Sequence, residues 1–245
     1  MIRQNALRHF NRDSYAAFRM HEKHDAKMRY GIVKDITKCV KYSRFFLNRM
    51  LDTLKAAADD NHITLDNSFK NDLAWFNKFL TNFNGTTFFH HKQCDATLEI
   101  DACLQGLGGR LNNEVYHIPI IQGYANYNIC HLEMINVLVI LKLWGKKLAN
   151  KKLLIKCDNQ ACVAVLNSGK TNDAILAAMS RNVQMLLATF NIVINVIHVM
   201  GVNNTVADVL SRWSISADVN TLLREIRNPV WVKVPADILD IDWCI

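Results

Sequence analysis

The chain has 245 residues, of which 50% are hydrophobic and 21% are charged, with only three prolines and nine glycines. A chain of this composition can bury a hydrophobic core, in one large domain or in one domain with a helical arm. The few prolines and glycines give no indication of a long disordered linker. No apolar run reaches the roughly 20 residues of a membrane span, and Met1 precedes a polar, charged segment rather than a signal core. We therefore expect no membrane partner, no secretion, and an intracellular location that is either cytoplasmic or nuclear.

The formal net charge of +7 lies entirely in the first third of the chain. Residues 1–93 hold 16 Lys and Arg against 9 Asp and Glu, whereas residues 94–245 hold 13 of each. A basic segment beside a neutral body favours a polyanionic partner, and a solvated Lys-rich helical surface is the alternative. The seven cysteines are an odd number and form no CxxC pair, which is typical of reduced thiols rather than of a disulfide framework.

The first 93 residues are predicted to form a basic helical arm. Apolar residues recur at helical spacing over residues 34–58 and again over residues 68–83. Asp66 or Asn67 can cap the second helix, and the pair Asn84-Gly85 can end it.

From residue 94 the pattern changes to an alternation of strands and helices. The expected strands cover residues 97–112, 115–121, 125–129, 152–157 and 192–199. The expected helices cover residues 130–148, 161–166, 175–190 and 206–212. Asn112-Asn113 would turn between the first two strands, Thr171 or Asn172 would cap the third helix, and Thr205 would cap the fourth. This order predicts an α/β domain over residues 94–213, a mixed five-stranded sheet flanked by helices, and an extended C-terminal segment at 214–245.

Four acidic residues interrupt apolar segments of this domain: Asp101, Glu133, Asp158 and Asp208. An ionised carboxylate out of water is costly unless it is paired or binds a metal. Their expected positions are a strand interior, a helix first turn, a strand end and the first turns of the last helix, which meet in open α/β sheets. Carboxylates of this kind suit Mg²⁺ or Mn²⁺ rather than Zn²⁺, and two such ions can cleave a phosphodiester.

Each carboxylate also has a purely structural interpretation. Glu133 can interact with a helix dipole, Asp158 can cap a helix, Asp208 can simply be exposed, and a buried Asp can be hydrogen-bonded. Four of them in these elements and in this order favour a shared metal site.

The segments that hold the four carboxylates resemble the ribonuclease H domain of reverse transcriptases. They are IDACLQGLGG, HLEMINVLVILKLW, IKCDNQACVAVLNSG and HVMGVNNTVADVLSR. The last is similar to the H-x-x-G-x-x-N-x-x-A-D-x-L-S-R ending of gypsy-like long-terminal-repeat elements and of DIRS-like tyrosine-recombinase retrotransposons. The segments CDNQACVAVLNSG and, earlier in the chain, DLAWFNKFLTNFNG resemble DIRS-like elements more than gypsy-like elements. The resemblance covers about residues 96–213, and a weaker one, to the polymerase thumb or connection, covers about residues 30–90.

This resemblance implies a ribonuclease H-like fold that cleaves the RNA strand of RNA–DNA hybrids with two Mg²⁺ ions, Mn²⁺ being an alternative. It makes Asp101, Glu133, Asp158 and Asp208 the metal ligands. His198, ten residues before Asp208, matches the family's mobile catalytic histidine. The alternative for His198 is a strand-end histidine held by backbone.

Three further residues are candidates for contact with the substrate. Asn204 matches the family's Asn and is expected to shape its loop. Asn159 and Gln160 follow the third carboxylate and could reach a minor-groove 2′-hydroxyl, the group that distinguishes RNA from DNA.

The chain lacks the polymerase palm, because Asp59-Asp60 has no Tyr-x-Asp-Asp hairpin around it. We expect no DNA synthesis by this chain alone, and the missing polymerase domain of the same polyprotein is a candidate partner. Two other functions stay open: a catalytically inactive nucleic-acid-binding remnant of a reverse transcriptase, and a DNA-cutting nuclease on the same fold.

Overall fold

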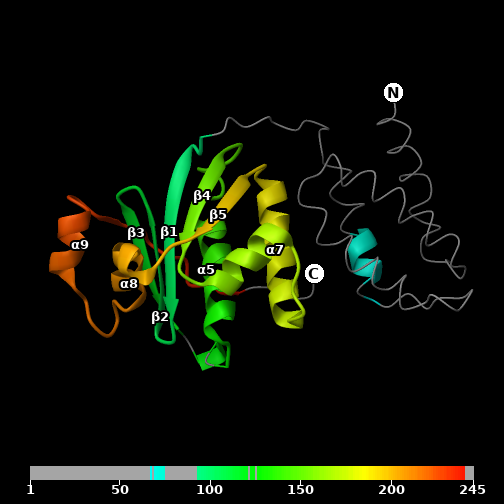
Figure 1. Ribbon diagram of the computed structural model, residues 1–245, viewed down its shortest axis with the longest axis horizontal. Helices are drawn as coiled ribbons and strands as arrows, with labels where there is room; N and C mark the ends of the chain where they lie inside the picture. The colour runs from blue at the N-terminus through cyan, green and yellow to red at the C-terminus, as the bar shows by residue number, and fades with distance from the viewer. Residues whose placement is uncertain (1–66, 68, 75–92, 121, 125, 241–245) are drawn as a thin grey trace, which may run out of the picture. The chain divides into compact units, whose positions relative to one another are not determined.

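A computed structural model describes residues 67, 69–74, 93–120, 122–124 and 126–240 (Figure 1). The chain divides into two compact units, residues 1–88 with residue 245, and residues 89–244. In the first unit, residues 67 and 69–74 are helical, as predicted, and Asn67 is therefore part of the helix rather than its cap. The predicted helix at 34–58 and the pair Asp59-Asp60 lie outside the described residues, so the basic helical arm stays a prediction.

The second unit is built on one mixed sheet with the strand order β5-β4-β1-β2-β3-β6. The first three strands form an antiparallel meander, whereas β4 runs parallel to β1 and β5 parallel to β4. The strands are β1 (Ala96–Cys103), β2 (Gly106–Leu111), β3 (Glu114–Pro119), β4 (Lys152–Cys157), β5 (Val193–His198) and β6 (Val230–Trp231). The predicted mixed α/β architecture is confirmed, but the sheet has six strands rather than five, because Val230 and Trp231 of the C-terminal segment pair with the edge of β3.

Two strand predictions are wrong in detail. Residues 97–112 form two strands rather than one, with a tight turn at Leu104 and Gln105, and Asp101 pairs with Gly108 across the hairpin. The apolar and small residues continue through this turn, so periodicity did not reveal it. The described part of the strand expected at 125–129, residues 126–129, contains no strand. The 3-10 helix η2 (Gln122–Tyr124) precedes this part, and the Asn128 side chain caps the next helix by accepting from the backbone N–H of His131.

The helices lie close to their predicted places. They are α5 (Ile129–Trp144), α6 (Gln160–Ser168), α7 (Ala174–Thr189), the 3-10 helix η3 (Gly201–Asn203), α8 (Thr205–Ser211) and α9 (Val219–Glu225). The cap of α7 is Asp173 rather than Thr171 or Asn172, since the Asp173 carboxylate accepts from the backbone N–H groups of Ile175 and Leu176. Asn204 rather than Thr205 occupies the capping position of α8.

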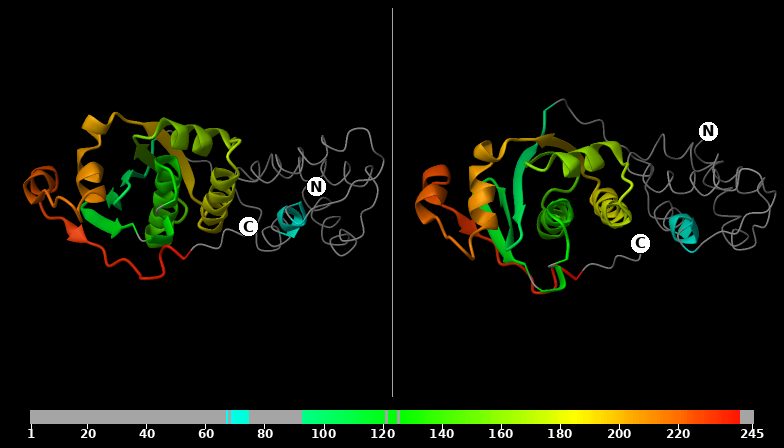
Figure 2. Two further views of the ribbon diagram at one scale, coloured as in Figure 1. Left: turned by 90° about the horizontal axis from the view of Figure 1, so that it is seen from below. Right: turned by 60° about the horizontal axis from the view of Figure 1, so that its bottom comes forward.

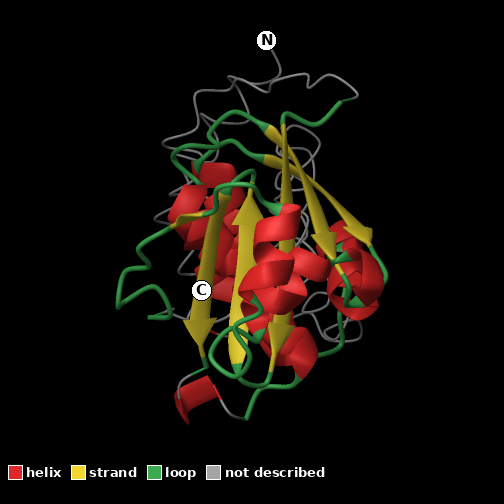
Figure 3. Cartoon of the chain, turned by 90° about the vertical axis from the view of Figure 1, so that its left-hand side faces the viewer, coloured by secondary structure: helices red, strands yellow, loops and turns green. Residues whose placement is uncertain are grey.

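The helices cover both faces of the sheet. Helices α5, α6 and α7 lie on one side, and α8 and α9 lie on the other (Figures 1 and 2). Figure 3 looks at the sheet from the α8–α9 side. Helix α5 packs against β1 and β2 and is itself covered by α7, so it is buried almost all round. Among the described residues, no helix is long and apolar enough to cross a membrane.

The C-terminal segment continues the α8 side of the fold. Leu222 and Ile226 of the α9 region pack with Val206 and Leu210 of α8 and with Val115 of β3. Farther along, the Lys142 ammonium group donates to the carbonyl oxygens of Ile238 and Asp240, both at 2.9 Å. Parts of the segment from α9 to Asp240 therefore pack on the body of the second unit. A separate C-terminal extension at residues 214–245 stays a prediction.

Candidate active site

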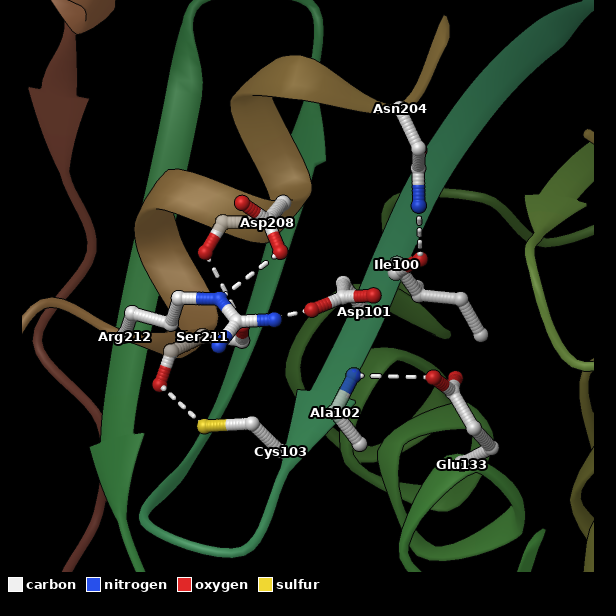
Figure 4. A network of polar contacts seen from close by, with 9 residues as sticks. All are labelled: Ile100, Asp101, Ala102, Cys103, Glu133, Asn204, Asp208, Ser211 and Arg212. Atoms are coloured by element: carbon white, nitrogen blue, oxygen red, sulfur yellow. Dashed lines mark hydrogen bonds and ion pairs between the residues drawn. The ribbon is translucent and has the colours of Figure 1, made fainter. Parts of the chain in front are cut away.

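The site lies where β1 and β4 stop pairing. Their register ends at Glu99 opposite Lys156, whereas β1 continues to Cys103. Beyond that point two side chains take the place of a neighbouring strand (Figure 4). The Asn204 amide donates to the Ile100 carbonyl at 2.7 Å, and the Glu133 carboxylate accepts from the Ala102 N–H at 2.9 Å. Splits of this kind between parallel strands are the usual place for a site in an α/β sheet.

Asp101 is held from both sides of the sheet. On the α8 side, the Ser211 hydroxyl donates to its Oδ2 at 2.5 Å. On the α5 side, the Asn136 amide donates to the carbonyl oxygens of Asp101 and Gly108, both at 2.8 Å, and accepts from the Tyr116 hydroxyl at 2.5 Å. The backbone and one carboxylate oxygen are therefore fixed, and Oδ1 is left to meet a ligand.

The electrostatic surroundings of Asp101 oppose its ionisation. The pKa of Asp101 is raised to about 7, mainly by burial. The Ser211 hydrogen bond and the charge of Arg212 lower this pKa, whereas the charges of Asp158 and Asp208 raise it. These interactions place Asp101 within electrostatic reach of two other candidate carboxylates.

Glycines in β2 allow α8 to approach Asp101. A Cβ atom on Gly106 would lie 2.3 Å from the Ser211 carbonyl oxygen, and one on Gly108 would lie 2.3 Å from the Ser211 nitrogen. Any side chain at either position would push α8 away from the sheet. The glycines of the IDACLQGLGG motif thus have a direct role in placing Asp208 and Ser211.

Glu133 reaches the site from α5 and is fully buried. It lies beyond the first turn of the helix, which contains no acidic residue, so the predicted first-turn position and the helix-dipole interpretation are both wrong. Its second carboxylate oxygen is 3.6 Å from the Cys157 sulfur. Burial raises the pKa of Glu133 well above its usual range, and Cys157 and Asp101 raise it further.

Asp158 follows β4 directly and lies beside Glu133. One ligand atom each from Glu133, Cys157 and Asp158 lies within 4.8 Å of the others. Asp158 does not cap α6, because the Asn159 side chain performs that role by accepting from the Cys162 N–H at 2.9 Å. The hydrogen bond with Cys162, together with burial, raises the pKa of the Cys157 thiol.

Asp208 projects from α8 on the opposite side of Asp101. Its Oδ1 accepts from the Arg212 Nε at 2.8 Å, and its side chain is 43% exposed. The alternative prediction that Asp208 is simply an exposed residue is therefore correct in part. The charge of Asp208 nevertheless raises the pKa of Asp101. The four predicted carboxylates therefore belong to one connected region, with Asp101 electrostatically linked to each of the other three.

The remaining predicted site residues lie around this region. His198, at the exposed end of β5, is 3.0 Å through Nε2 from the Asp158 carbonyl oxygen, which is the backbone-held arrangement given as its alternative. Asn204 is 2% exposed and shapes the loop before α8, as expected, with its amide directed at β1. Gln160 is exposed at the start of α6, whereas the side-chain oxygen of Asn159 is engaged in capping that helix. Substrate contact by these three amides stays a prediction.

The donor set fits a hard divalent cation. It offers four carboxylates, and two of them, Asp101 and Glu133, are buried with raised pKa values, so that a nearby positive charge would favour their ionised forms. Within the part of the chain that the structure describes, Arg212 is the cation that forms an ion pair with one of the four. Oxygen donors such as these four carboxylates suit Mg²⁺ or Mn²⁺.

Sequence reasoning missed four residues of the site: Ser211, Arg212, Asn136 and Tyr116. Ser211 and Arg212 stand in the quoted motif ADVLSR, and their proximity to Asp208 in the sequence was the available signal. Asn136 was visible as a polar residue within an apolar helix, a position that usually demands hydrogen-bond partners. Tyr116 carried no such signal.

Comparison with known proteins gives limited similarity. No family model matches the chain, and no curated protein matches it. Among solved structures, RNase H1 from the halophilic archaeon Halobacterium salinarum NRC-1 is similar over 49% of this chain and 95% of its own, at 16% identity and a TM-score of 0.39. At this identity and TM-score the similarity does not assign an activity to the chain.

Proposed function

We propose that the second unit is a metal-dependent ribonuclease H that cleaves the RNA strand of RNA–DNA hybrids. One observation carries the proposal: Asp101, Glu133, Asp158 and Asp208 come from four elements to the split between β1 and β4. Two of these carboxylates, Asp101 and Glu133, are buried with raised pKa values, which is costly in a structural role and is typical of functional sites. The mixed sheet and the quoted motifs agree with the fold that the ribonuclease H resemblance implies.

Each carboxylate has a defined role in this proposal. Asp101, Glu133, Asp158 and Asp208 would together hold two Mg²⁺ ions, with Asp101 as the central ligand of the set. Bound Mg²⁺ would supply an activated water and stabilise the leaving oxygen of the phosphodiester. Ser211 and Ala102 hold Asp101 and Glu133 in place, which limits the reorganisation required for catalysis. His198, which is exposed and contacts the Asp158 carbonyl oxygen through Nε2, would assist the reaction from the rim of the site.

The wider context is part of the same proposal. The motif HVMGVNNTVADVLSR supports an origin in a retrotransposon polyprotein, with the polymerase domain of that polyprotein as a partner. The basic first third of the chain would then contribute to holding the hybrid.

The decisive experiment is strand-resolved cleavage of an end-labelled RNA–DNA hybrid in the presence of Mg²⁺. We expect the wild-type chain to cleave the RNA strand and Asp158→Asn to leave it intact. Salt-dependent binding of the hybrid without cleavage by a folded wild-type chain would favour the inactive remnant. Cleavage of duplex DNA in preference to the hybrid would favour the DNA-cutting nuclease.

A further inference from the structure

The candidate site has an uneven distribution of counter-charge. On the α8 side, the Arg212 guanidinium donates from Nε to Asp208 Oδ1 at 2.8 Å, and its charge also acts on Asp101. On the other side, the structure records no ion pair between Lys or Arg and either Glu133 or Asp158 within the described residues. One half of the site therefore carries its own cation, and the other half does not.

The position of Arg212 makes this cation replaceable. Its side chain is 54% exposed, and it pairs with a residue one helical turn earlier, where the Asp208 side chain is also accessible to solvent. Exposed ion pairs of this kind are weak, and the arginine stem can swing into water without leaving a buried charge behind. A divalent cation bound by Asp208 and Asp101 would compete with Arg212 for the Asp208 carboxylate, and it would repel the guanidinium.

We propose that Arg212 is a built-in counter-ion that competes with a divalent cation for Asp208 and Asp101. The half of the site formed by these two residues then binds its cation more weakly than the half formed by Glu133 and Asp158. This inference rests on the proposed function, because it assumes that the four carboxylates hold metal. Arg212, the arginine of the ADVLSR motif, would then set the metal concentration at which the weaker half of the site is occupied.

The test is a titration of the full chain with Mn²⁺. Binding is measured by calorimetry and by the loss of the electron paramagnetic resonance signal of free Mn²⁺. We expect the wild-type chain to bind at two affinities. Arg212→Met keeps most of the stem and removes the charge, and it should strengthen the weaker binding by roughly three- to tenfold while the stronger binding changes less. Arg212→Lys retains a charge and should remain close to wild type.

Arg224→Met is the matched control. Arg224 is an exposed arginine of α9 that pairs with Glu225, so its replacement removes the same charge from the neighbouring helix. It should leave both Mn²⁺ affinities unchanged. An Asp208→Asn background should abolish the gain produced by Arg212→Met, because the competition requires the Asp208 carboxylate.

The outcomes separate the two proposals. Unchanged Mn²⁺ affinities in Arg212→Met, or an equal gain in Arg224→Met, would refute the counter-ion while leaving the nuclease intact. A folded wild-type chain that binds no Mn²⁺ at all would refute the metal site and the counter-ion together.

Discussion

The Ser211 hydroxyl donates a hydrogen bond of 2.5 Å to Asp101 Oδ2, although 110 residues separate the two in the chain. Ser211 is fully buried and belongs to the last turn of α8, whereas Asp101 lies within β1. The contact exists because Gly106 and Gly108 let the backbone of α8 lie directly on β2. It orients one carboxylate oxygen and leaves the other for a ligand.

Replacing Ser211 with Ala should impair the site more than the fold. The hydrogen bond lowers the pKa of Asp101, so its loss should raise that pKa above about 7 and move the acid limb of the cleavage profile to higher pH. Stability should fall by about 1–3 kcal/mol, the usual effect of removing a hydrogen bond to a charged group. Profiles of kcat against pH would measure the shift, with Ser216→Ala at an exposed position as the control. An unshifted profile would show that Ser211 does not act through Asp101.

Replacing Gly108 with Ala should destabilise the second unit. The new Cβ would lie 2.3 Å from the Ser211 nitrogen and 2.5 Å from the Leu210 carbonyl carbon, both backbone atoms that cannot move independently of α8. We expect a loss of about 1–3 kcal/mol by overpacking, together with loss of cleavage because Asp208 moves with α8. Denaturant unfolding would measure it. Gly123→Ala is the control, since a Cβ there meets no atom within 4 Å, and equal losses in the two variants would contradict this explanation.

The Tyr116–Asn136 pair should behave as one unit. Tyr116→Phe removes the donor to Asn136, and Asn136→Leu leaves the carbonyl oxygens of Asp101 and Gly108 without their side-chain donor. We expect Asn136→Leu to cost more, about 2 kcal/mol, because it also leaves the buried Tyr116 hydroxyl without its acceptor. The double variant should cost less than the sum of the two, with a coupling of about 0.5 kcal/mol or more in a double-mutant cycle. Strict additivity would mean that the pair does not act as a network.

Stability of the metal-free protein should fall as pH rises through the acidic range. The folded-state pKa of Asp101 is raised to about 7, so the folded protein binds more protons than the unfolded chain between the ordinary carboxyl pKa and that value. Unfolding free energy must therefore decrease with pH over about pH 4 to 7, by on the order of a few kcal/mol, and Glu133 acts in the same direction.

Added Mg²⁺ or Mn²⁺ should reverse this trend. The cation favours the ionised carboxylates, so it should raise Tm more at pH 8 than at pH 5. Asp101→Asn should lessen the loss of stability with pH in the metal-free protein. Thermal unfolding at the two pH values measures both effects, and a Tm shift that is equal at pH 5 and pH 8 would argue against binding through Asp101 and Glu133.

Local patterns in the sequence were sufficient for most of the architecture. Helical periodicity placed α5 and α7 within a few residues, and short apolar runs placed β4 and β5 equally well, because each element buries apolar side chains of its own. The break after Cys103 was missed, since Leu104 and Gln105 lack the turn residues that usually mark a hairpin. The pairing of Val230 with Glu114 was also missed, because two residues carry no periodic signal.

The sequence by itself determined which side chains carry charge into the core: Asp101, Glu133, Asp158 and Asp208 each stand out against apolar neighbours. Only the tertiary structure decided what surrounds them. Ser211 meets Asp101, Asn204 meets Ile100 and Glu133 meets Ala102 through contacts between residues 31 to 110 positions apart. Such contacts depend on the strand order and on how closely α8 packs on β2, and neither property is encoded in any one local segment.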